Sequence, residues 1–131
     1  EFTDLCCKYN LEERNVWSED LHIPDSSIIE NNTIILRNCL IEEDVVIGYG
    51  CCINTNTNLH HGVKLAKYIT IGPGATLLGN VEVGESSFIG AGAIIRENIK
   101  IGKNVTIGMG SVVVEDVPDY STFVGNPATH L

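Results

Sequence analysis

The stretch IGPGATLLGNVEVGESSFIGAGAIIRENIKIGKNVTIG (71–108) places an aliphatic residue at every sixth position, beginning with Ile71. The same spacing extends without an insertion from Ile23 to Val113, and every position in this series is Ile, Leu or Val. An amphipathic helix needs a period of about 3.6 residues, which this series does not supply. A fixed short period indicates a repeat fold in which each unit stacks on its neighbours.

Two further positions of each six-residue unit are restricted. Four residues after each aliphatic stands a small or β-branched residue, as in Thr57, Ala75 and Ser87. Three residues after it stands Gly, Asn, Asp or Ser, with Tyr68 as the exception, and these residue types tolerate left-handed or turn conformations. Each unit is therefore expected to be a short strand plus a corner, with one large and one small residue pointing inwards.

The sequence predicts an all-β protein, a left-handed parallel β-helix of hexapeptide repeats with about five triangular coils over residues 23–117. This handedness opposes the usual right-handed crossover, and the unbroken repeat justifies the exception. Residues 1–22 are expected to be a lead-in or cap with a short helix, because an open end with unpaired strand edges must be covered. Residues 118–131, which contain Pro118 and Pro127, are expected to be a loop or tail leaving the prism.

Composition narrows the possible partners. The chain has 131 residues, enough for one domain, and its net charge of -9 argues against binding nucleic acid or an anionic membrane. No apolar run is long enough to span a bilayer, and the odd number of cysteines favours a reducing cytoplasm. All bases after residue 45 lie between Lys64 and Lys103, where a phosphate-bearing ligand is expected unless this is ordinary solvated surface.

A coil of eighteen residues makes residues n and n+18 neighbours, and this rule singles out His61. Glu43 lies one coil below His61 and Gly79 one coil above. An imidazole with an ordinary pKa of about 6.5, next to an exposed glycine N–H and a carboxylate, is suited to act as a general base beside an oxyanion donor. The alternative is an ordinary surface histidine. His60 is adjacent, and His61 is favoured because it shares the column of Gly79.

Covalent catalysis by a cysteine and catalysis by a bound metal fit the sequence less well than a histidine base does. Cys39 and Cys51 occupy inward positions and are expected in the core, whereas Cys52 points outwards beneath Thr70 without a group that lowers a thiol pKa. Zinc sites on enzymes commonly use three histidines, and the repeat contains only His60 and His61. No metal ligands are therefore predicted.

Residues 54–128 closely resemble one branch of the hexapeptide acyltransferases, the sugar O- and N-acetyltransferases that include sialic acid O-acetyltransferases and acetyltransferases of nucleotide-linked amino sugars. The matching stretches are NTNTNLHHG (54–62), IGPGATLLGNVEVG (71–84), SFIGAGAIIRENIKIGKNVTIGMGSVV (87–113), EDVP (115–118) and VGNPA (124–128).

The resemblance implies roles for individual residues. The family's base falls on His61, and the acid that follows it falls on Gly62, so that partner is missing here. We hypothesise that Glu43 replaces it. The family's Asn matches Asn54, its thioester-binding amide matches Gly79, and a second histidine that some members place against the cofactor is Thr70 here.

The resemblance also implies a homotrimer in which acetyl-CoA lies between adjacent prisms and donates acetyl to an amine or hydroxyl of a small sugar or nucleotide-linked sugar. The pantetheine arm is expected to pass Gly79, Ala91 and Met109 towards the VGNPA stretch. Lys100 and Lys103 are candidate phosphate contacts on the basis of their charge. Many relatives carry a βαβ sugar-nucleotide domain ahead of the β-helix, and residues 1–22 are either the end of such a domain or the start of a short member.

Two other functions stay open at this point. One is a catalytically silent trimeric β-helix that acts as a scaffold, since the acid after His61 is missing. The other is a metal hydratase of the γ-carbonic-anhydrase type, which the poor ligand set disfavours.

Overall fold

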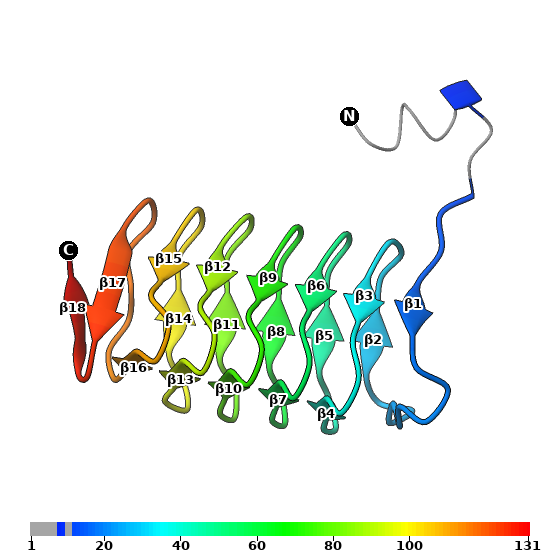
Figure 1. Ribbon diagram of the computed structural model, residues 1–131, viewed down its shortest axis with the longest axis horizontal. Coiled ribbons are helices and arrows are strands. Elements are labelled where there is room, and N and C mark those ends of the chain that lie inside the picture. Colours follow the sequence, from blue (N-terminus) through cyan, green and yellow to red (C-terminus); the bar gives the residue numbers. More distant parts are fainter. Residues whose placement is uncertain (1–7, 10–11) are drawn as a thin grey trace.

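Short strands wind around one long axis in the computed structural model, which describes residues 8–9 and 12–131, and stack into three sheets (Figure 1). We name them sheets A, B and C. Sheet A contains β1 (Val16–Trp17), β3 (Ile34–Ile35), β6 (Cys52–Ile53), β9 (Thr70–Ile71), β12 (Phe88–Ile89), β15 (Thr106–Ile107), β17 (Thr122–Gly125) and β18 (Ala128–His130). Sheet B contains β2 (Ile28–Ile29), β5 (Val46–Ile47), β8 (Lys64–Leu65), β11 (Glu82–Val83) and β14 (Lys100–Ile101). Sheet C contains β4 (Leu40–Ile41), β7 (Asn58–Leu59), β10 (Thr76–Leu77), β13 (Ile94–Ile95) and β16 (Val112–Val113).

The register confirms the coil of eighteen residues. Leu59 pairs in parallel with Ile41 on one side and with Leu77 on the other, and the strands of sheets A and B repeat the same offset up to β15 and β14. The last parallel pair, β15 with β17, is offset by sixteen residues instead, as in Ile107 with Phe123. The chain visits the sheets in the order A, C, B within each coil, so that three edges run along the prism. We call them the A–C, C–B and B–A edges.

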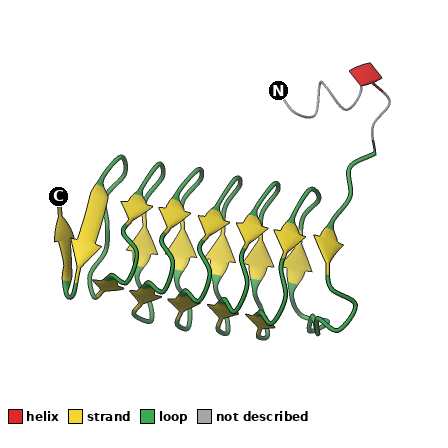
Figure 2. Cartoon of the chain, in the orientation of Figure 1, coloured by secondary structure: helices red, strands yellow, loops and turns green. Residues whose placement is uncertain are grey.

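The corners adopt the left-handed backbone conformation that the sequence predicts. Every sixth residue from Asn32 to Gly110 has a positive φ. Tyr68, the exception to the composition rule, also has a φ of 58°. These corners separate two-residue strands joined by turns, which Figure 2 shows along the whole prism. The left-handed β-helix of hexapeptide repeats is therefore confirmed.

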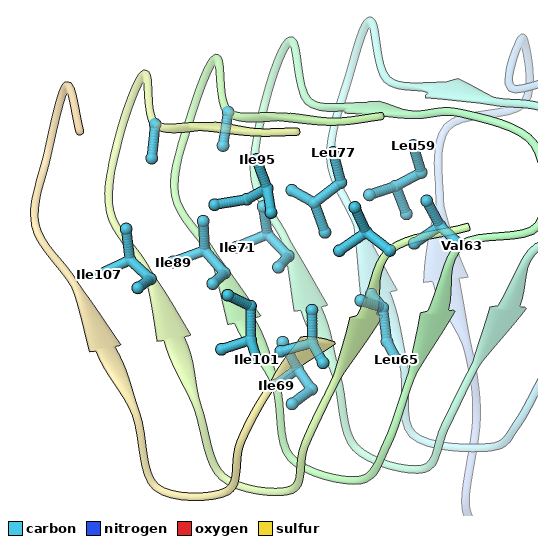
Figure 3. Packing of buried hydrophobic residues seen from close by; sticks show 14 of the residues in the cluster. Leu59, Val63, Leu65, Ile69, Ile71, Leu77, Ile89, Ile95, Ile101 and Ile107 are labelled. Atoms are coloured by element: carbon cyan, nitrogen blue, oxygen red, sulfur yellow. The ribbon is translucent and has the colours of Figure 1, made fainter. Parts of the chain in front are cut away.

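The core is a set of aliphatic stacks inside the prism. Figure 3 shows Leu59, Leu77 and Ile95 in one row and Ile71, Ile89 and Ile107 in another. All six side chains are fully buried. The small inward positions are also filled as predicted, and the Thr57 hydroxyl donates to the Asn54 carbonyl at 2.7 Å.

Both ends of the prism differ from the prediction. Trp17 lies in β1, which pairs in parallel with β3, so the ladder begins before Ile23. Residues 118–131 are not a loop or tail, because β17 pairs with β15 and forms an antiparallel hairpin with β18. The solenoid therefore has about six turns rather than about five. The short helix expected at the N-terminus falls largely outside the described residues. No helix in the described part of the chain is long and apolar enough to cross a membrane.

Ala93 offers a test of the interior packing, because its side chain is fully buried at one of the small inward positions. We expect Ala93→Leu to lower the free energy of unfolding by about 1–3 kcal/mol, because the prism has no room for the added carbons. Chemical denaturation measures this change. Ala66→Leu adds the same atoms at an exposed alanine and is the control. Equal stability of the two variants would contradict this account of the packing.

Candidate functional site

The two adjacent histidines lie at the C–B edge, directly after β7. Leu59 enters the core, and the chain then turns through His60 and His61 to Gly62, whose φ is +68°. The His60 N–H donates to the Leu77 carbonyl at 3.0 Å and fixes the turn to the next coil. The His61 side chain is 65% exposed and that of His60 is 30% exposed, so the site opens to the surface at His61.

The carboxylate that contacts both histidines belongs to Glu42. One of its oxygens, Oε1, lies 3.1 Å from His60 Nδ1. The other, Oε2, accepts the backbone N–H of His61 at 2.8 Å and lies 3.6 Å from His61 Nδ1. The 3.6 Å separation from Nδ1 is too long for a hydrogen bond, and the contact becomes an ion pair only when the ring is protonated.

Glu43, the partner proposed from the column rule, contributes its backbone instead. Its carbonyl accepts the N–H of Gly62 at 3.0 Å, and its side chain is exposed. Glu42 lies directly beneath His60, and its side chain reaches diagonally to His61. The column rule considers only residues eighteen apart, so it did not identify Glu42.

The pKa of Glu42 is lowered, first by the hydrogen bond from the His61 backbone N–H and then by the charge of His60, while partial burial opposes the shift. The group is therefore a carboxylate under ordinary conditions. Because its folded-state pKa is depressed, the stabilisation from its contacts is present above the ordinary glutamate pKa and is lost as the pH falls through the lower folded value.

Gly79 lies against the His61 ring, one coil above. A Cβ on Gly79 would stand 2.5 Å from His61 Nε2 and 2.6 Å from its Cε1, so only glycine leaves room for this ring. Within the described part of the chain, the Gly79 N–H donates no backbone or side-chain hydrogen bond, although both neighbours, Leu78 and Asn80, donate theirs to carbonyls. An imidazole and an amide N–H without a protein acceptor therefore lie side by side.

Asn54 lies at a different edge from His61. It follows β6 at the A–C edge, and its Nδ2 donates to the Ile71 carbonyl at 2.9 Å. Within one chain, sheet C separates it from the histidines, because β7 connects the two edges. Asn54 remains a predicted site residue, and one prism alone does not bring it to His61.

The predicted cofactor residues occupy two sheets and all three edges. Ala91 and Met109 lie one above the other at the A–C edge, where the Gly110 N–H donates to the Ala91 carbonyl. Thr70 lies on sheet A between Cys52 and Phe88. Gly79 lies with His61 at the C–B edge. A single chain therefore does not assemble this set into one pocket.

The two predicted phosphate contacts have acidic neighbours. Lys100 Nζ and Lys64 Nζ lie 4.0 Å and 3.7 Å from opposite carboxylate oxygens of Glu82 on the face of sheet B. Lys103 lies at the B–A edge, where its backbone N–H donates to Asp119 Oδ1 at 2.8 Å. Phosphate binding by Lys100 and Lys103 stays a prediction.

Cysteine and metal chemistry gain no support from the geometry. Burial raises the pKa of the Cys51 thiol to about 11, as expected for a core residue. Cys52 pairs with Thr70 on the outer face of sheet A, as the sequence predicts. No group of three or more His, Cys, Asp or Glu in residues 8–9 and 12–131 is arranged to hold a metal ion.

The outer faces of the three sheets differ in character. Sheets A and C expose large apolar side chains, each about two-fifths accessible, on β3, β4, β12 and β13: Ile34, Leu40, Phe88 and Ile94. Sheet B presents the exposed Ile28 on β2 and, on three later strands, the charged residues Lys64, Glu82 and Lys100. A hollow of about 460 Å³ near the N-terminal coils, lined by Ile34, Tyr49 and Tyr68 among others, does not include His61. The His61 side chain, which is mostly exposed, stands on an open surface of the single chain.

Comparisons with known proteins agree with the resemblance found in the sequence. The family described as bacterial transferase hexapeptide (six repeats) matches residues 80–115. No curated protein sequence matches the chain significantly.

Solved structures match nearly the whole chain. The acetyltransferase domain of PglB from Neisseria gonorrhoeae, in complex with acetyl coenzyme A, is 32% identical with a TM-score of 0.93, and the match covers 98% of this chain and 63% of that one. PerB from Caulobacter crescentus, in complex with CoA and GDP-perosamine, is 28% identical with a TM-score of 0.95, covering 99% and 63%. WeeI from Acinetobacter baumannii is 28% identical with a TM-score of 0.84, covering 99% and 64%. The chain thus spans less than two thirds of each of these structures.

Proposed function

We propose that the chain is the catalytic β-helix of an acetyltransferase that moves acetyl from acetyl-CoA to an amine or hydroxyl of a sugar or nucleotide-linked sugar. The observation that carries the proposal is the His61 ring lying against Gly79, whose N–H has no protein acceptor in the described chain. The similarity to PglB and PerB, whose solved complexes contain acetyl coenzyme A or CoA, supports the donor. PerB also holds GDP-perosamine, which supports a nucleotide-sugar acceptor.

In the proposed reaction, His61 Nε2 removes a proton from the acceptor nitrogen or oxygen as that atom attacks the thioester carbonyl. The new bond to carbon places negative charge on the carbonyl oxygen, and the Gly79 N–H donates to it. When the carbon–sulfur bond breaks, the thiolate of CoA leaves and takes a proton from the imidazolium. His61 is then neutral again, and acetylated acceptor and free CoA are the products.

A homotrimer would complete this site. The predicted cofactor contacts Ala91 and Met109 lie at the A–C edge, whereas Gly79 lies at the C–B edge. Facing edges of two adjacent prisms can bring them together around one ligand.

Calorimetric titration with acetyl-CoA is the first test of the proposed function. We expect saturable binding at about one site per chain, with an affinity between about 1 μM and 1 mM, the usual range for enzyme substrates. Light scattering on the same sample measures whether the protein is a trimer. If trimeric protein does not bind acetyl-CoA at millimolar concentration, the proposed acetyltransferase function is wrong. The non-catalytic trimeric scaffold would then be the better explanation.

A further inference from the structure

We propose that Glu42 is the positioning residue of His61, and that it holds His60 in the same network; the inference rests on the function proposed above. Glu42 replaces the acid that follows the base in the resembled family, from a different place in the fold. It would fix the orientation and the protonated nitrogen of His61 without itself touching the substrate.

The two carboxylate oxygens of Glu42 divide their contacts between the histidines. Oε1 faces His60 Nδ1 at 3.1 Å, which anchors the carboxylate from one side. Oε2 accepts the His61 backbone N–H at 2.8 Å and faces the same residue's Nδ1 at 3.6 Å. The backbone and the ring of His61 are therefore both oriented by one oxygen, and His60 keeps that oxygen in place.

The position after His61 carries no side chain. Gly62 has a φ of +68°, and a Cβ there would meet Oδ1 of the exposed Asn80 side chain, one coil above. Asn80 is held there in turn, because its Nδ2 donates to Asn98 Oδ1 at 3.3 Å. No carboxylate follows His61 in the chain, and the carboxylate beside it comes from the coil below.

The chemical consequence is a defined tautomer. An ionised carboxylate that faces Nδ1 favours the proton on that nitrogen and leaves Nε2 free as the base. Nε2 is also the ring atom nearest to a Cβ built on Gly79. When His61 has taken a proton, the negative charge of Glu42 stabilises the imidazolium, and Glu42 stays ionised throughout, as in the aspartate of serine hydrolases.

Glu30 supplies a matched control for the structural part of this arrangement. Its Oε2 accepts the backbone N–H of Tyr49 at 2.9 Å, nineteen residues on, as Glu42 does for His61. At this corner Tyr49 occupies the place that His61 has at the Glu42 corner, and no histidine is adjacent to it in the sequence. Glu30→Gln therefore replaces the same kind of charged corner acceptor by a neutral amide as Glu42→Gln does, at a place where no base is present.

The first test measures which nitrogen of the His61 ring carries the proton, and it requires no acetyl acceptor. Long-range proton–nitrogen NMR spectra at about pH 8.5, where ordinary imidazoles are neutral, distinguish protonation at Nδ1 from protonation at Nε2. We expect His61 to be mainly the Nδ1–H form in the wild type. Glu42→Gln should lower that fraction by about two-fold or more, whereas Glu30→Gln should leave it unchanged.

The second test is kinetic. We expect Glu42→Gln to lower kcat by about ten- to a hundred-fold, part of the about 10²- to 10⁴-fold that a positioned base contributes, with KM for acetyl-CoA nearly unchanged. Glu30→Gln should keep the wild-type kcat. His60→Ala should give an intermediate loss of kcat, because Glu42 then loses its second anchor.

The two tests separate the failure of this inference from failure of the proposed function. An unchanged His61 tautomer in Glu42→Gln would overturn the role of Glu42, whether or not the protein acetylates a sugar. Equal losses of kcat in Glu42→Gln and Glu30→Gln would also overturn it, since a general loss of structure would then explain both. If the wild type does not bind acetyl-CoA but the tautomer depends on Glu42, the proposed function fails and the network stands.

Discussion

His61→Ala is expected to lower kcat for acetyl transfer by about 10²- to 10⁴-fold, because it removes the group that takes the acceptor proton. The His61 side chain is 65% exposed and contributes nothing to the buried core. The fold and the oligomeric state should therefore survive. Steady-state kinetics with acetyl-CoA and an amino-sugar acceptor measure the effect, and calorimetry checks that acetyl-CoA still binds.

A control histidine separates loss of the base from loss of any exposed imidazole. His22 is exposed and lies outside the proposed site, so His22→Ala should retain the wild-type rate. Loss of donor binding together with turnover in His61→Ala would show that the residue holds the donor. Wild-type turnover in His61→Ala would exclude it as the base, and His60→Ala would then be the next variant to compare.

The repeat made most of the fold predictable, because the period of six dictates both the inward residues and the offset of eighteen between coils. Its ends were harder to predict. Trp17 stands six residues before Ile23 but is not aliphatic, so the aliphatic series begins one unit later than the ladder does. The hairpin of β17 and β18 pairs antiparallel, which a repeat of parallel strands does not contain.

The site was predictable as far as it follows the columns. His61 and Gly79 are eighteen residues apart and lie in contact in the structure. Glu42 was missed because its side chain crosses from one column to the next, and a diagonal contact depends on side-chain length and rotamer rather than on spacing. The predicted cofactor residues lie on different edges, so their arrangement around a ligand depends on how prisms assemble.

Gly79→Ala is expected to lower kcat by about 10²-fold while the protein remains folded, because a displacement of a catalytic group by about 1 Å can cost that much. The added Cβ would stand 2.5 Å from His61 Nε2, so the ring must move away. Gly79 does not have a positive φ, and alanine can adopt its backbone conformation. The alanine also keeps the N–H, so the variant changes the position of the base and not the oxyanion donor.

Gly48→Ala is the matched variant, because its Cβ would meet backbone rather than a side chain. It would stand 2.6 Å from the Ala66 carbonyl oxygen and 2.7 Å from the carbonyl carbon, in the next coil of the prism. A backbone packed between two coils moves less easily than an exposed ring, so we expect this variant to lose about 1–3 kcal/mol of folding free energy. Gly79→Ala should therefore lose kcat but little stability, whereas Gly48→Ala should lose stability but little kcat. Denaturation and kinetics on both variants measure these changes. If Gly79→Ala keeps its full rate, the ring of His61 works equally well away from Gly79, and the contact between them is not part of catalysis.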